Sequence, residues 1–163
     1  MAVDAYLTLR GKNQGDIDGP VTDKGLENTI FIHSYSNQIV SPRDPASGLP
    51  TGTVQHQPIV LLKDVDKTSP LLWTAFTSNE VLIVWQLNFM QTSTPDVAPT
   101  QIYTIKLTNA SIASIREFMA DNDDPTLANR PLQQEITFTY QKIEWIWTDG
   151  GVTSEDDWKT PVA

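Results

Sequence analysis

Apolar and polar residues alternate along most of the chain, and this period of two predicts a protein built mainly of β-strands. In residues 4–10, one face carries Ala5, Leu7 and Leu9. Residues 28–40 and 53–63 are rich in β-branched and aromatic side chains and predict further strands, with Pro58 marking a bulge or an edge.

The strand predicted from residue 80 to residue 90 is apolar on both faces. Val81, Ile83, Trp85, Leu87 and Phe89 are expected to share one face. The opposite face is also partly apolar, so this strand should be covered on both sides. We expect the second cover to be a helix or a neighbouring subunit.

The last part of the chain predicts more strands, within residues 101–119 and 135–147. In the later segment the apolar positions change phase between Tyr140 and Ile143, which indicates a bulge that bends a sheet toward closure. Residues 120–131 are expected to form an acidic loop, and the chain should end in a short tail after the turn at Gly150 and Gly151.

One helix interrupts the strands near the middle of the chain. Ser69 is expected to be its N-cap and Pro70 its first helical residue, because a serine hydroxyl can accept a free backbone N–H and proline has none to offer. Asn79 can end the helix in a left-handed conformation. The face that should pack on the strands contains Leu71, Leu72, Ala75 and Phe76.

Residues 41–52 contain three prolines and two glycines and have no period. Such a segment cannot form a continuous hydrogen-bond ladder, so we predict a long loop and a candidate contact surface. The order of strands, one helix and strands predicts an all-β fold, a β-barrel or sandwich with a single flanking helix, with residues 1–163 as one domain.

Charge and composition narrow the possible functions. The chain has 163 residues and a formal net charge of −9, so nucleic acid and anionic membranes are poor partners. It has no cysteine, which excludes disulfides and thiolate chemistry. The first residues do not resemble a secretory signal, and no apolar run is long enough to span a membrane. We therefore expect a soluble cytosolic chain whose export, if any, uses another route.

Candidate chemistry is sparse. His33 and His56 fall inside predicted strands without a catalytic motif around them, and the glycines of residues 11–25 lack phosphate-loop spacing. The acidic residues 121–124 lack the ligand spacing of a calcium loop. We predict no catalytic residue, no cofactor and no metal site.

Two alternatives depend on aromatic and acidic side chains. Exposed Trp145 and Trp147, with Trp158, could form a sugar-stacking platform in a carbohydrate- or ligand-binding β-sandwich. Glu135 and Glu144 could serve a glycosidase, which places two acids across a bond. Core and interface positions are the favoured interpretation of the tryptophans, because aromatic residues dominate both settings.

Three stretches of the chain contain further sequence motifs. Residues 51–76 contain K-x-x-D-K-x-S-P leading into the predicted helix. Residues 15–36 contain G-x-I-x-G and a later serine-aromatic-serine pattern, and residues 140–151 contain Y-x-K-I-x-W in the last long predicted strand. Together the three stretches resemble the Hcp family, the hemolysin-coregulated tube proteins of bacterial type VI secretion. Asn37 departs from the family, which often has glycine there.

This resemblance implies a barrel of two antiparallel β-sheets with one short flanking helix, assembled into a hexameric ring. Rings would stack into a tube inside a contractile sheath, capped by a spike protein of the VgrG type. Contraction would expel the tube from the bacterial cytoplasm, with cargo effectors in its lumen. The resemblance thus implies a structural protein that is secreted without a signal peptide and is not an enzyme.

The resemblance also assigns roles to residues. The helix would be a brace formed by Ser69, Pro70, Leu71, Leu72, Ala75 and Phe76. The loop of residues 41–52 would reach the adjacent ring, with stacking contacts at Pro42, Arg43, Asp44, Pro45 and Leu49. Ser34 and Ser36, on one face of a strand, would line the channel and contact effectors.

Overall fold

The computed structural model of the protein describes residues 2–158, which contain one helix and two main β-sheets. The larger sheet, called the large sheet below, has the strand order β13-β12-β9-β8-β1-β2, with β3 also paired to β1. Its strands are β1 (Ala2–Gly11), β2 (Gly15–Ile17), β3 (Ile30–Ile32), β8 (Leu82–Thr92), β9 (Thr100–Thr108), β12 (Lys142–Trp147) and β13 (Val152–Asp157). Every pairing in it is antiparallel.

The second sheet, called the small sheet, has the order β10-β11-β7-β4 and is also antiparallel. Its strands are β4 (Ser34–Ser36), β7 (Ile59–Asp64), β10 (Ser111–Phe118) and β11 (Gln133–Thr139). The helix is α1 (Ser69–Thr77). Two short strands, β5 (Ile39–Val40) and β6 (Gln55–His56), pair with each other as a separate ribbon.

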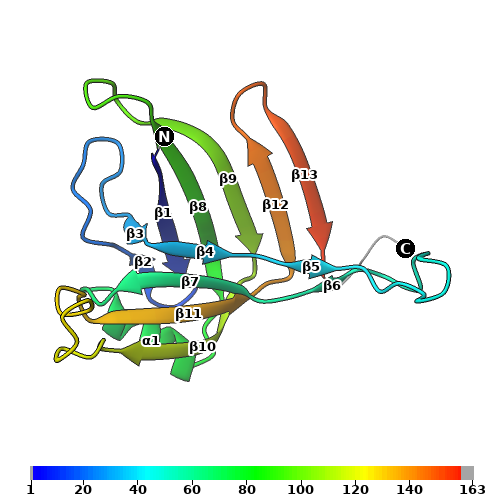
Figure 1. Ribbon diagram of the computed structural model, residues 1–163, viewed down its shortest axis with the longest axis horizontal. Coiled ribbons are helices and arrows are strands. Elements are labelled where there is room, and N and C mark those ends of the chain that lie inside the picture. The colour runs from blue at the N-terminus through cyan, green and yellow to red at the C-terminus, as the bar shows by residue number, and fades with distance from the viewer. Residues whose placement is uncertain (1, 159–163) are drawn as a thin grey trace.

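Figure 1 shows how these parts are arranged. The strands of the small sheet run across one end of the large sheet, α1 lies beside the small sheet, and the β5–β6 ribbon leaves the body at one side. The predicted fold class is therefore confirmed: the protein is mainly β, with packed antiparallel sheets and one short helix.

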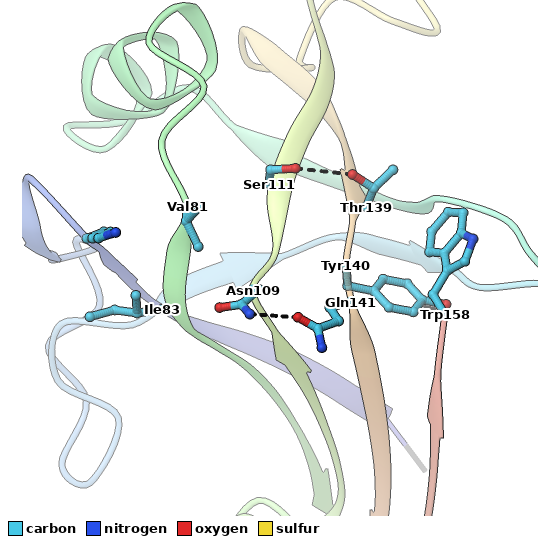
Figure 2. Close-up of a pocket in the computed structure, with 9 residues that line it drawn as sticks. Val81, Ile83, Asn109, Ser111, Thr139, Tyr140, Gln141 and Trp158 are labelled. Carbon is cyan, nitrogen blue, oxygen red and sulfur yellow. Dashed lines mark hydrogen bonds between the residues drawn. The ribbon is translucent and has the colours of Figure 1, made fainter. Parts of the chain in front are cut away.

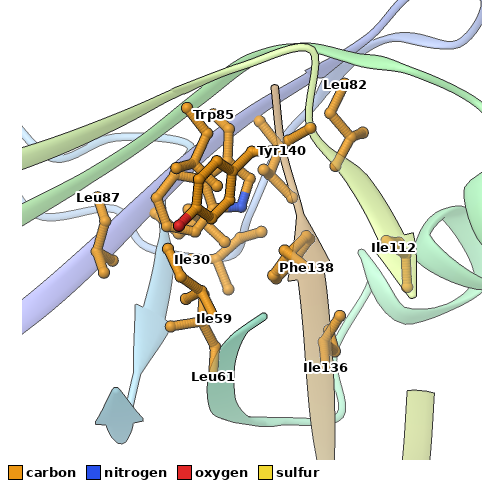
Figure 3. Close-up of a cluster of buried hydrophobic side chains, with 14 of the residues drawn as sticks. Ile30, Ile59, Leu61, Leu82, Trp85, Leu87, Ile112, Ile136, Phe138 and Tyr140 are labelled. Atoms are coloured by element: carbon orange, nitrogen blue, oxygen red, sulfur yellow. The ribbon is translucent and has the colours of Figure 1, made fainter. Parts of the chain in front are cut away.

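The core lies where the two sheets cross (Figure 3). The register of the large sheet places Leu7, Leu87 and Ile105 side by side in one row. The small sheet contributes Leu61 and Phe138 among others, and the Phe138 ring meets the Trp85 ring edge to face at a centroid distance of 5.6 Å. Burying each of these large side chains contributes about 1.5–3 kcal/mol to stability.

A bulge changes the faces of β8. The pairing of β1 with β8 shifts between Arg10 and Gly11, so Ile83 is an extra residue between two paired neighbours. As a result Leu82 is fully buried and Ile83 is 47% exposed. The prediction that Ile83 shares the buried face of Trp85 and Leu87 was wrong, because one inserted residue reverses the alternation.

Three predicted strands are divided because the chain passes from one sheet to another. The first part of residues 53–63 forms β6 in the ribbon, and the rest belongs to β7 in the small sheet. Residues 28–40 form β3 in the large sheet, β4 in the small sheet and β5 in the ribbon. Residues 133–147 form β11 in the small sheet and β12 in the large sheet. The phase change after Tyr140 was located correctly, but it marks this crossing rather than a bulge within one strand.

The segment after the turn at Gly150 and Gly151 forms a strand that was not predicted. Residues 152–157, expected to be part of a tail, form β13, which pairs with β12 through a turn at Gly150 and Gly151. Both glycines have positive φ angles, of 83° and 64°, which glycine adopts without the steric cost of a side chain. Residue 1 and residues 159–163 of the predicted domain lie outside the described residues.

The helix begins differently from the prediction. Its N-cap is Thr68, without a side-chain cap hydrogen bond, and Ser69 is the first helical residue. Leu72 and Ala75 are buried as expected and Phe76 packs against the core, but Leu71 is 36% exposed. The expectation that Leu71 lies on the helix face that packs on the strands was therefore wrong. Asn79 has a φ of 53°, which confirms the left-handed ending.

Lys63 explains why Ser69 does not cap the helix. The Lys63 side chain is fully buried, and its Nζ donates to Asp64 O (2.8 Å), Gln134 Oε1 (3.0 Å), Asp66 Oδ1 (3.3 Å) and Ser69 Oγ (3.3 Å). Ser69 Oγ donates to Gln134 Oε1 at 2.8 Å and accepts the Asp66 N–H at 3.0 Å. Burial lowers the pKa of Lys63, and Asp66 acts in the opposite direction.

The segment after the helix is tied to the turn between β1 and β2. The Glu80 side chain is buried, and its carboxylate accepts the backbone N–H groups of Asn13 (3.1 Å) and Gln14 (3.0 Å). A Cβ on Gly11 would lie 1.9 Å from Glu80 Oε2, so only glycine leaves room for this contact. Both ends of α1 are thus fixed by buried polar side chains.

Replacing Leu72 by aspartate should destabilise the fold by about 3–5 kcal/mol, because the substitution buries an unpaired charge. Leu71→Asp is the matched control on the exposed side of the same helix and should change the free energy of unfolding much less. Urea unfolding of both variants measures the difference. Equal stability of Leu72→Asp and the parent protein would contradict the packing of α1.

Lys63→Met should cost about 3 kcal/mol of unfolding free energy, since it removes one of the two donors to Gln134 Oε1 and leaves the largely buried Asp66 carboxylate without its opposite charge. The control is Lys67→Met, four residues away at an exposed position. Thermal and urea unfolding report both. A loss below about 1 kcal/mol for Lys63→Met would show that the hydrophobic contacts alone place the helix.

Candidate assembly site

The segment between β5 and β6, residues 41–54, projects from the body and is called the arm below. Figure 1 shows it reaching well beyond both sheets. Its root is the β5–β6 ribbon, with Ile39 paired to His56 and Val40 to Gln55. Farther out, Arg43 and Pro50 form an isolated bridge. The predicted loop is therefore a long hairpin-like projection.

The tip of the arm is organised by Asp44. Its carboxylate accepts the Ala46 N–H at 3.1 Å and the Ser47 hydroxyl at 2.8 Å, and its own N–H donates to Leu49 O at 2.9 Å. These hydrogen bonds, that from Ala46 first, lower the pKa of Asp44. Gly48 closes the turn with a φ of 74°.

The five predicted stacking residues all lie on this arm. Arg43, Pro45 and Leu49 are exposed, and Pro42 and Asp44 are half-buried. Leu49 is 64% exposed at the tip, and Val40 and Val54 are exposed nearer the root. The arm thus carries apolar side chains away from the core, where they cannot contribute to the folding of the body.

The predicted channel residues lie on β4. Ser34 and Ser36 are exposed and pair with Leu62 and Val60 of β7, on the edge of the small sheet. Tyr35 between them points inward, and its ring meets the Phe89 ring at 5.3 Å between centroids. Burial raises the pKa of Tyr35 to about 12, so this hydroxyl remains protonated at neutral pH. The outer face of this strand is accordingly small and polar.

The tryptophans do not present one flat surface. Trp147 is 47% exposed, and its ring lies 6.5 Å from the Tyr103 ring. Trp145 packs against the core, and Trp158 stacks on His56. A sugar platform built from Trp145 and Trp147 together therefore has one exposed member.

The carboxylates considered for a glycosidase lie in different sheets. Glu135 is on β11 of the small sheet, whereas Glu144 is on β12 of the large sheet, with its Oε1 at 3.7 Å from Lys142 Nζ. Within residues 2–158, no group of three or more histidine or acidic side chains is arranged to hold a metal ion. His33 Nε2 lies 3.0 Å from Asp64 Oδ1 at an exposed position.

Sequence reasoning missed the surroundings of His56. This residue contacts Tyr140, Asp156 and Trp158, which follow it by 84 to 102 positions in the chain. No local motif signals contacts between residues so distant in sequence. The local signal near His56 is Pro58, which predicts an irregular backbone at the end of the ribbon but does not predict the contacts of the imidazole.

A pocket of about 690 Å³ opens beside this region (Figure 2). Asn109 Nδ2 donates to Gln141 Oε1 at 2.8 Å, and the Ser111 and Thr139 hydroxyls lie 3.2 Å apart. The lining is completed by Lys12, Val81, Ile83, Tyr140 and Trp158. Among the lining residues the ionisable groups are Lys12 and Tyr140.

Comparison with known proteins agrees with this architecture. The family described as "Type VI secretion system effector, Hcp" matches residues 6–147. A protein of Pseudomonas aeruginosa named "Major exported protein" is 36% identical, over 100% of this chain and 99% of that protein.

Solved structures are similar over nearly the whole chain. A crystal structure described as that of an Hcp protein has a TM-score of 0.87 at 25% identity and covers 98% of this chain and 99% of its own. Secreted protein Hcp3 from Pseudomonas aeruginosa has a TM-score of 0.76 at 26% identity and covers 98% and 100%.

Fold and arm together define a class of two-sheet β proteins with one flanking helix and a long projection between two short paired strands. The sequence match and the solved structures specify the family within that class. The chain belongs to the Hcp family of the type VI secretion system.

Proposed function

We propose that the chain is a structural subunit of the inner tube of a type VI secretion system. Hexameric rings of this subunit stack into a tube, which sheath contraction expels with effectors in its lumen. The observation that carries the proposal is the arm, an ordered projection with an exposed Leu49 at its tip, in a chain of the Hcp family.

Ring formation and stacking use different surfaces in this proposal. Contacts between unlike surfaces of identical subunits close into a ring when the rotation between neighbours is a simple fraction of a circle. The arm then reaches the adjacent ring, with Pro42, Arg43, Asp44, Pro45 and Leu49 as the stacking contacts. The apolar tip supplies buried area, and Arg43 offers a charge-assisted hydrogen bond.

Ser34 and Ser36 face the lumen and contact effectors. Their small hydroxyl groups support this role, because they form weak contacts. A channel wall with weak contacts can hold cargo during assembly and also release it. The helix acts as a brace for the wall. Further partners are a spike protein of the VgrG type and the contractile sheath.

The route of the protein follows from the same proposal. The subunit is made in the bacterial cytoplasm and leaves through the type VI apparatus, in agreement with the name of the exported Pseudomonas relative. Residues 1–163 act as one domain that binds no cofactor and catalyses no reaction. The net charge of −9 disfavours nucleic acid and anionic lipid as partners. In residues 2–158, no helix has the length and apolarity needed to cross a membrane.

A carbohydrate- or ligand-binding role remains a second candidate because of Trp147, whose exposed ring continues the aromatic row of Phe89 and Tyr103. Such a module would not need the arm. Titration with sugars while tryptophan fluorescence is followed separates the two functions, since a tube subunit should show no saturable quenching.

Native mass spectrometry at micromolar concentration should give a dominant hexamer. Head-to-tail contacts between subunits produce one closed stoichiometry rather than a ladder of sizes. A clean monomer at all concentrations up to the solubility limit would contradict the ring.

Deleting residues 43–49 should leave rings intact but prevent their stacking and reduce secretion into the culture medium. Arg43 and Pro50 pair across the arm, so the two ends left by the deletion lie close together. A two-glycine link can therefore close the shortened arm without strain on the ribbon. Leu49→Ser in an intact arm is the finer test and should reduce stacking at least several-fold. Full secretion of the deletion variant in a strain without other Hcp would rule out the arm as the contact between rings.

A further inference from the structure

The arm is attached to the body through two irregular backbone segments. The last described pair of β4 and β7 is Ser36 with Val60, and the first pair of the ribbon is Ile39 with His56. Between these pairs lies Pro58, which has no N–H, and Gln57 N donates to Gln38 O within the ribbon. The ribbon pairs with neither main sheet. Residues 37–38 and 57–59, which lie between the two sets of pairs, could therefore act as a hinge and are called the hinge below.

Beyond this hinge, His56 connects the ribbon to the body. Its side chain is only 1% exposed. Nδ1 lies 2.7 Å from the Tyr140 hydroxyl, which precedes β12, and Nε2 lies 2.5 Å from Asp156 Oδ2 on β13. The Trp158 ring stacks on the imidazole at 5.4 Å between centroids and 21° between planes. Figure 2 shows Tyr140 and Trp158 side by side at this point.

Two hydrogen bonds join the His56 imidazole to the body. The Asp156 carboxylate accepts, so Nε2 carries a proton and donates to it. Nδ1 is hydrogen-bonded to the Tyr140 hydroxyl, whose pKa is raised by burial. Both ring nitrogens therefore have a hydrogen-bond partner. A rotation of the ribbon about the hinge would break both hydrogen bonds and leave buried polar atoms without partners.

We propose that His56, Tyr140, Asp156 and Trp158 form a clamp that fixes the direction of the arm relative to the large sheet. An isolated two-stranded ribbon is only marginally stable and offers little resistance to bending. A small rotation at its root moves the tip by a much larger distance. The clamp holds the root on the far side of the hinge from β4 and β7, where restraint is most effective.

The absence of cysteine from the sequence permits a direct test by spin labelling. Ala46→Cys at the arm tip and Thr8→Cys on β1 are exposed positions for two labels. Labelled subunits are mixed with a large excess of unlabelled protein, so that distances within one subunit dominate. Double electron–electron resonance then measures the distribution of distances between tip and body.

The labelled parent protein should give one narrow distribution. Adding His56→Ala should widen it at least twofold, and Asp156→Ala should widen it in the same way. The control is His33→Ala, which removes an exposed histidine that also pairs with an aspartate and should leave the width unchanged. Circular dichroism confirms that each variant retains the folded body, and Asp156→Ala decides the question if His56→Ala does not fold.

Three results would overturn the clamp: a broad distribution in the parent protein, an unchanged width in the folded His56→Ala or Asp156→Ala variant, or equal widening by His33→Ala. The consequence that a loosened arm also weakens stacking rests on the proposed function. The distance measurement does not, because it concerns one subunit. A protein that forms no rings but shows clamp-dependent distances would therefore contradict the tube and retain the clamp.

Discussion

A buried ammonium group must be hydrogen-bonded on every side, and in this protein that constraint organises the junction of helix and sheet. Lys63 on β7 reaches Gln134 on β11 and Ser69 at the start of α1. Strand pairing places Lys63 directly opposite Gln134, so the same two residues join the strands and receive the helix. This contact links the start of α1 to the small sheet, and Leu72 in the same helix is fully buried.

The passage of the chain between two sheets explains the rest of the architecture. Residues 30–36 and 133–147 each contribute strands to both sheets, so the chain connects the two sheets at both places. The arm arises where β4 and β7 stop pairing, and the clamp residues Tyr140 and Asp156 come from the crossing between β11 and β12 and from β13. The root of the arm therefore contacts residues of the large sheet as well as continuing from the small sheet.

Much of the fold could be predicted from the sequence because the alternation of Ala5, Leu7 and Leu9, and the helix ending at Asn79, are local signals. The exposure of Ile83 could not, since one bulge reverses the alternation without any sign in the apolar pattern. The role of Ser69 depends on Gln134, sixty-five positions away, and that of His56 on residues still more distant. The prolines and glycines of residues 41–52 located the arm, but neither they nor the family motifs carried information on what holds it.

The central claim is that identical subunits build a tube in which the arm joins successive rings and β4 faces the lumen. Cryo-electron microscopy of the assembled protein tests it most directly. The account predicts six-fold rings in register along the axis, with Leu49 of one ring buried against the next and Ser34 and Ser36 on the inner wall. A tube whose arms lie free in solvent, or whose β4 strands face outward, would contradict it.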